Sequence, residues 1–179
     1  LGIECSILEV QKLGWFLERG VKRFGGSDAL KFRFQANKYG PYSHNLTKLL
    51  DSLDGSYLRC DKRLADADPL DLIWFNDAKY DRVQAYLNSG EGKQFSSVLE
   101  WASATIDGFE SPLGMELLAT VDWMMQHDDI EPTVEGVMEG LKDWAGGEVA
   151  GQRKLKIFDR RLVAIALGQL QISNRLPAC

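Results

Sequence analysis

Residues 108–125 read GFESPLGMELLATVDWMM, and they are the most informative segment of this sequence. Ser111 is a residue type that caps helix N-termini, and Pro112 suits the first helical position. Apolar residues then recur at helical spacing, at Leu117, Leu118, Val121, Met124 and Met125. The segment therefore predicts a turn that leads into an amphipathic helix over residues 112–127.

In the sequence around this helix, the Lys, Arg, Asp and Glu positions are all acidic. No Lys or Arg lies between Lys93 and Lys142, an interval that holds ten carboxylates: Glu100, Asp107, Glu110, Glu116, Asp122, Asp128, Asp129, Glu131, Glu135 and Glu139. The whole chain has a formal net charge of −5, so the remainder is net positive. Such a run usually forms solvated faces that point in different directions. Alternatively, it forms one acidic surface that enters a basic groove as a phosphate backbone would.

The chain has 179 residues, of which 45% are apolar and 10% aromatic. This length and composition fit one packed domain. No apolar run approaches the roughly 20 residues of a membrane span, and no signal-peptide pattern is present. Because the chain begins Leu-Gly rather than with Met, we expect a fragment of a longer cytoplasmic protein that has a further N-terminal domain.

The residue types that most often carry chemistry are few. The cysteines Cys5, Cys60 and Cys179 are far apart and have no ligand-like spacing, which predicts reduced thiols in a reducing compartment. His44 and His127 belong to no nucleophile or metal motif, and no glycine pattern for binding phosphate occurs. We therefore expect no catalytic residue, no metal and no cofactor.

The remaining pattern predicts an α+β domain that is mostly helical, with six or seven helices and a small two- or three-stranded sheet. A capping box at Ser6 and Glu9 opens the first helix, which we expect to end at Gly20. A second helix follows a Gly40-Pro41 turn and a Ser43 cap, and ends at Asp54-Gly55. Strands are expected at residues 30–36, 56–60 and 70–75, and further helices at 77–87, 94–107, 112–127, 133–144 and 158–170.

Two short motifs each have two interpretations. The segment 39–42, Tyr-Gly-Pro-Tyr, places two tyrosines beside a rigid turn, which suits a recognition surface but equally suits a turn that covers the adjacent strand. Glu110 and Glu116 flank Ser111-Pro112. They could act as a general acid and base, or simply complement the dipole at the helix N-terminus.

Three segments resemble the C-terminal region of the DarG antitoxin family: EVQKLGWFLE, KFRFQANKYGPYSHNLTKLLDSLDGSYL and GFESPLGMELLATVDWM. The resemblance runs from Glu9 to Trp123 and implies a single toxin-binding domain over residues 1–179. The macrodomain that precedes this region in the family, and that removes ADP-ribose from DNA, is absent. The first sixty residues or so also resemble the Panacea domain of other antitoxins. Asp122 stands where the family's ATVHW run has His.

In this family the C-terminal region binds the toxin DarT, which transfers ADP-ribose from NAD onto a base of single-stranded DNA. The resemblance therefore implies a non-enzymatic antitoxin chain with the DarT-type ADP-ribosyltransferase toxin as its partner. An acidic, DNA-mimicking surface would occupy the DNA groove of that toxin. We expect no membrane association and no direct DNA binding. The expected partner contacts are Tyr39, Tyr42, Asn45, Asp107, Glu110, Ser111 and Glu116.

Two other functions fit parts of the sequence. A transcriptional autoregulator would bind nucleic acid through basic segments near the two ends of the chain. It requires one cationic face that combines Lys31, Arg33, Arg153, Lys154 and Arg160. A hydrolase would require Glu110 and Glu116 to lie close together in a pocket.

Overall fold

The computed structural model describes residues 4–25 and 30–175, so the expectation for Cys179 lies outside the described residues. Within these ranges the chain forms nine α-helices and two small antiparallel sheets, which confirms a mostly helical α+β domain. The helices α4 (Gly90–Lys93) and α8 (Glu148–Ile157) were not predicted.

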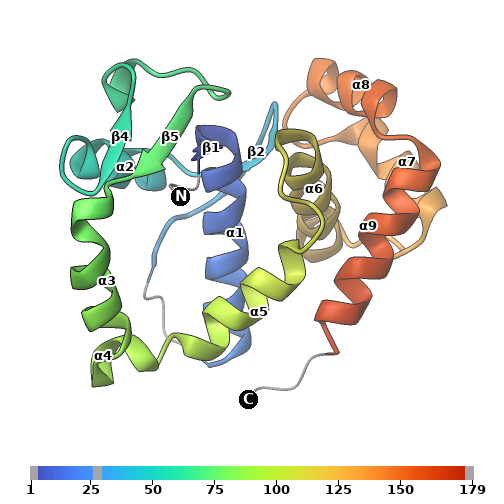
Figure 1. Cartoon of the computed structure of the whole chain (residues 1–179). Coiled ribbons are helices and arrows are strands. Elements are labelled where there is room, and N and C mark those ends of the chain that lie inside the picture. The colour runs from blue at the N-terminus through green and yellow to red at the C-terminus, as the bar shows by residue number, and fades with distance from the viewer. Residues whose placement is uncertain (1–3, 26–29, 176–179) are drawn as a thin grey trace.

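The other helices are α1 (Ile7–Arg23), α2 (His44–Leu53), α3 (Tyr80–Leu87), α5 (Ser96–Ile106), α6 (Pro112–His127), α7 (Val134–Gly140) and α9 (Arg160–Ser173). Short 3-10 turns are η1 (Leu64–Asp66), η2 (Asp77–Lys79) and η3 (Leu141–Asp143). One sheet has the order β1 (Glu4–Ser6), β5 (Leu72–Phe75), β4 (Leu58–Cys60), and β2 (Gln35–Asn37) pairs with β3 (Gly40–Tyr42) as a hairpin. Figure 1 shows α1 in the middle, with the three-stranded sheet and α3 on one side and α6 to α9 on the other.

The helix α6 spans residues 112–127, as predicted. The Ser111 hydroxyl accepts the Gly114 N–H at 3.1 Å, and Pro112 occupies the first turn. The helix is not amphipathic, however, because every residue from Met115 to Met124 is buried. It packs against α1, α9 and β3, and its apolar residues join one core that extends from α1 to α9.

The predicted capping box of α1 is confirmed. The Ser6 hydroxyl accepts the Glu9 N–H at 3.3 Å, and the Glu9 carboxylate accepts the Ser6 N–H at 2.6 Å. The prediction that Gly20 ends this helix is wrong, because α1 continues to Arg23. A Cβ at Gly20 would lie 2.9 Å from a methyl carbon of Val98 on α5. This glycine therefore allows close packing of two helices.

The strand predicted at residues 30–36 forms only at its end, from Gln35. Lys31 and Arg33 have φ angles of 49° and 55°, which interrupt the extended backbone. The alternation in the sequence reflects burial of Phe32 instead. The turn before Ser43 is also two residues earlier than predicted, at residues 38–39, and Gly40 begins β3.

The strands predicted at residues 56–60 and 70–75 are confirmed by β4 and β5, whereas β1 was not predicted. Cys5 and Cys60 are opposite Ile73 on the two sides of β5. Two strand spacings separate them by about 10 Å, which is too far for a disulfide. Both thiols are free, as expected. None of the helices in the described ranges is long and apolar enough to cross a membrane.

Candidate partner-binding site

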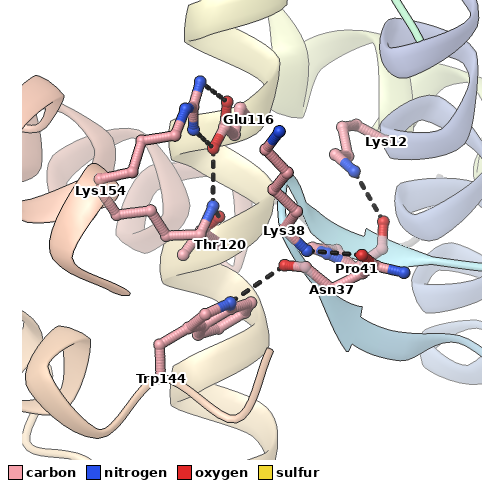
Figure 2. Close-up of polar contacts among 9 residues, drawn as sticks. Lys12, Asn37, Lys38, Pro41, Glu116, Thr120, Trp144 and Lys154 are labelled. Atoms are coloured by element: carbon pink, nitrogen blue, oxygen red, sulfur yellow. Dashed lines mark hydrogen bonds and ion pairs between the residues drawn. The ribbon is translucent and has the colours of Figure 1, made fainter. Parts of the chain in front are cut away.

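The β2–β3 hairpin is held in place by side chains that are distant in sequence. Trp144, directly after η3, donates its indole N–H to the Asn37 carbonyl at 3.0 Å. Lys12 of α1 donates to the Pro41 carbonyl at 2.7 Å. Figure 2 shows these two bonds reaching the hairpin, one from α1 and one from the loop after η3. The hairpin is therefore held by hydrogen bonds from within the chain.

Gly40 allows the hairpin to lie directly on α6. Its φ of 93° is in the left-handed region, which favours glycine. A Cβ at this position would be 2.9 Å from the Thr120 hydroxyl oxygen. The Gly-Pro pair thus fixes the distance between β3 and α6.

The structure brings together three of the predicted contact residues, Tyr39, Tyr42 and Asn45. The two tyrosines are half-buried and Asn45 is exposed. The Tyr42 hydroxyl accepts from the Thr47 hydroxyl at 3.0 Å, and the Asn45 amide donates to the Lys31 carbonyl at 3.1 Å. Each tyrosine therefore covers its neighbours and also reaches the surface, and a role of this motif in recognition stays a prediction.

A pocket of about 250 Å³ lies between the hairpin and the start of α1. Tyr39 and Tyr42 form part of its wall, and Lys12 lies among the residues that line it. Its apolar wall is completed by Ile7, Leu8 and Pro69. A second pocket of about 200 Å³, which shares Tyr42 with the first, is also lined by Asn45. Two of the predicted contact residues therefore border a concave apolar surface.

Asp107, Glu110 and Ser111 are exposed at the turn between α5 and α6. Glu116 is not part of this acidic surface, because its side chain is only 2% exposed. Its carboxylate accepts from Arg153 at 2.6 and 3.1 Å and from Lys154 at 2.7 Å. The expectation that Glu116 faces a partner is corrected by this geometry.

The ion pairs of Glu116 connect α6, α8 and the hairpin. Lys154 is fully buried and also donates to the Thr120 hydroxyl at 3.3 Å. The Arg153 guanidinium lies over the Tyr39 ring, 4.8 Å from its centroid. Figure 2 shows Glu116, Thr120 and Lys154 on the α6 side of the hairpin. Glu116 therefore supports Tyr39 through Arg153 rather than by reaching the surface.

Two lysines in this region have pKa values far below their ordinary value of 10.5. Burial and, to a lesser extent, the nearby Lys154 together lower the pKa of Lys12 to about 7, against the opposing effect of Glu116. Burial also lowers the pKa of Lys154 to about 8, while Glu116 again acts in the opposite direction. Both ammonium groups are therefore costly to keep charged inside the protein.

Asp122 has a polar role that the sequence did not predict. Its side chain is 1% exposed and accepts from the Trp15 indole at 2.8 Å and from Arg19 at 3.0 Å. These bonds tie α6 to α1. The carboxylate is therefore a structural element of the helix pair.

The acidic interval is not one continuous surface. Glu116 and Asp122 are buried, Glu135 pairs with Arg160, and Glu139 pairs with Lys142. Six exposed acids remain without an ion pair among the described residues: Glu100, Asp107, Glu110, Asp128, Asp129 and Glu131. Five of them form two groups beyond the opposite ends of α6, which are about 24 Å apart at 1.5 Å per residue.

The arrangement does not favour the two alternative functions. The cationic face that an autoregulator requires is not formed, because Lys154 is buried, Arg153 binds Glu116 and Arg160 pairs with Glu135. The carboxylate pair that a hydrolase requires is not formed either, because both oxygens of Glu116 accept from cations. No group of three or more His, Cys, Asp or Glu side chains in the described ranges could hold a metal ion.

The chain is similar to proteins named DNA ADP-ribosyl glycohydrolase. It is 29% identical to the Thermus aquaticus protein over an aligned region of 173 residues. This region covers 97% of this chain and 41% of that relative. It is 26% identical over 170 residues to the proteins of Mycobacterium bovis and Mycobacterium tuberculosis, over 92% of this chain and 44% of theirs. The chain thus spans less than half the length of these relatives. No family model matches it.

These relatives support the resemblance to DarG proteins at the level of the family. They also contradict the expectation of a non-enzymatic chain, because the proteins matched over most of its length carry the name of an enzyme.

Proposed function

We propose that this chain is the toxin-binding region of a DarG-type antitoxin, and that residues 1–179 act as one domain. Its partner is a DarT-type ADP-ribosyltransferase toxin, which it meets in the cytoplasm. The similarity over 92–97% of the chain to longer proteins named DNA ADP-ribosyl glycohydrolase supports this proposal. We also propose that the whole protein has the glycohydrolase activity. In addition, we propose that about the first sixty residues of this chain are Panacea-like.

The observation that carries the proposal is the fixed hairpin. Its tyrosines border an apolar pocket, and hydrogen bonds from Trp144 and Lys12 hold its backbone. A rigid aromatic surface loses little entropy when a protein binds to it. Tyr39, Tyr42 and Asn45 therefore form the first contact region. Asp107, Glu110 and Ser111 form the second contact region. Glu116 does not contact the toxin itself but binds Arg153, which packs against Tyr39 of the first contact region.

We further propose that the chain inhibits the toxin by occupying its DNA groove. The exposed acids at the N-terminal end of α6, Asp107 and Glu110, form no ion pair with a Lys or Arg in the described part of the chain. A groove that binds DNA phosphates through Lys and Arg would attract them.

The test is a competition experiment with catalytically inactive toxin. Labelled single-stranded DNA is bound to the toxin, and this chain is added while the anisotropy of the DNA label is measured. We expect the DNA to be displaced at stoichiometric amounts of the chain, and less readily by Tyr39→Ala than by Tyr80→Ala. Tyr80 is a matched control because it is 57% exposed at the start of α3. If DNA and the chain bind the toxin together, occupation of the DNA groove is wrong.

A further inference from the structure

Lys12 has fewer hydrogen bonds than its burial demands. Its ammonium group has three donors, and it makes one hydrogen bond among the described residues, to the Pro41 carbonyl. The residue is only 2% exposed. Buried donors without acceptors are costly, and the cost is greater for a charged group. Lys12 is therefore incompletely satisfied at the wall of a pocket.

The contrast with Lys154 shows that this shortage is specific to Lys12. Lys154 donates to Glu116 and Thr120, and it also lies over the rings of Trp144 and Phe158 at 5.2 and 5.4 Å. Lys12, Arg153 and Lys154 share Glu116 as their nearby carboxylate, and that carboxylate bonds to the other two cations. The region therefore has an excess of positive charge, which a further carboxylate would balance.

The pocket beside Lys12 has the size and lining for one side chain. Its volume of about 250 Å³ is below the ~300–1,000 Å³ of pockets that bind drug-sized ligands. Ile7, Leu8 and Pro69 supply apolar walls, which suit methylene groups. A chain of methylenes that ends in a carboxylate matches both the walls and the cation.

We propose that this pocket receives a glutamate side chain of the partner toxin, with its methylenes against the apolar wall and its carboxylate on Lys12. The proposal rests on the proposed function, because the toxin is the protein that presents this side chain. It adds a cation-mediated anchor next to Tyr39 and Tyr42, separate from the acids that face the DNA groove.

Binding of this carboxylate is linked to protonation of Lys12. With a pKa of about 7, the empty site is only partly protonated at neutral pH. The charged groups around it are Lys154, Arg153 and Glu116, with Lys38 on the hairpin also lining the pocket. An additional carboxylate favours the charged ammonium and raises its pKa. Toxin binding should therefore be tighter at pH 6 than at pH 8, through Lys12.

The first experiment uses the chain alone and does not depend on the toxin. The side-chain Cε resonances of ¹³C-labelled lysines are followed by NMR during a pH titration, and Lys12 is assigned with Lys12→Met. Butyrate, which has the methylenes and carboxylate of glutamate, is added as the probe, and butyramide is its neutral control. We expect butyrate to raise the titration midpoint of Lys12 and butyramide to leave it unchanged. Equal responses to both probes, or no response to butyrate, would overturn the proposal.

The second experiment measures the toxin affinity of the wild-type chain and Lys12→Met at pH 6 and pH 8. We expect the substitution to raise Kd at least about tenfold at pH 6 and to abolish the pH dependence. Equal affinities of the two proteins would refute the glutamate anchor and leave the antitoxin proposal intact. If the wild-type chain does not bind the toxin, the proposed function fails together with the anchor, even where butyrate binds.

Discussion

Glu116 binds Arg153, which is partly exposed, and Lys154, which is fully buried, so its loss leaves a buried cation without a counterion. Because the Lys154 side chain is fully buried, Glu116→Gln should lower the free energy of unfolding by about 3–5 kcal/mol. The matched control is Glu110→Gln, since Glu110 is exposed two residues before α6 begins, and it should change stability by less than about 0.5 kcal/mol. Urea unfolding of both variants measures the difference. Equal effects would show that the ion pairs contribute little.

Lys12 should make stability depend on pH in a defined direction. Its pKa is about 7 in the folded chain against an ordinary 10.5, so between these values the unfolded chain binds more protons. Stability therefore rises as the pH increases through this window, and is lost as the pH falls toward 7. Lys12→Met removes this contribution. The unfolding free energies of the wild type and Lys12→Met are measured by urea unfolding at several pH values. We expect the wild-type value to increase relative to the variant's value as the pH is raised from neutrality. A constant difference would show that Lys12 titrates normally.

The position of Glu116 could have been predicted in part from its helix. The segment 115–124 is apolar nearly all round, which is typical of a buried helix, and Glu116 and Thr120 are one turn apart within it. The sequence therefore contained a signal for a buried polar pair on α6. The partners could not be predicted, because Arg153 and Lys154 are 37 and 38 residues away. Lys12 gave no signal at all, because a lysine on a helix is ordinarily exposed.

At the scale of elements, local signals succeeded and long-range pairing did not. The helices α1 and α6 begin where predicted, since their capping hydroxyls act within three residues. The helix α8 was missed because the residue before it, Gly147, provides no side-chain cap. The strand at residues 30–36 was predicted too long, because its regular alternation conceals the positive φ of Lys31 and Arg33. What forms a strand here is the hairpin partner β3, which alternation cannot reveal.

The hairpin can be displaced from α6 by a single methyl group. Gly40→Ala places a Cβ 2.9 Å from the Thr120 oxygen and also strains a φ of 93°. Gly55→Ala is the matched control, because Gly55 also has a positive φ, of 69°, but a Cβ added there would have no atom within 4 Å. We expect Gly40→Ala to cost about 1–3 kcal/mol more than Gly55→Ala, as for overpacking, and to weaken toxin binding. Unfolding free energies and toxin titrations of both variants test this.

Across the whole molecule, the charge run predicted from sequence divides into two separate acidic ends. The acids between them, Glu116 and Asp122, connect α6 to α8 and α1. The hairpin lies on the N-terminal half of α6, because Gly40 meets the backbone of Glu116 and the side chain of Thr120. The end of α6 that carries Asp107 and Glu110 is therefore the nearer one to Tyr39 and Tyr42.

Neutralising each end separately should distinguish one contact surface from a general charge effect. We expect Asp107→Asn with Glu110→Gln to raise the Kd for toxin and to reduce the slope of log Kd against log salt. The control set, Asp128→Asn, Asp129→Asn and Glu131→Gln, removes one more charge at the far end and should change both quantities less. Titrations at several salt concentrations measure the two slopes. If the far-end set has the larger effect, the toxin contacts the opposite end of α6, and the hairpin is not the centre of the interface.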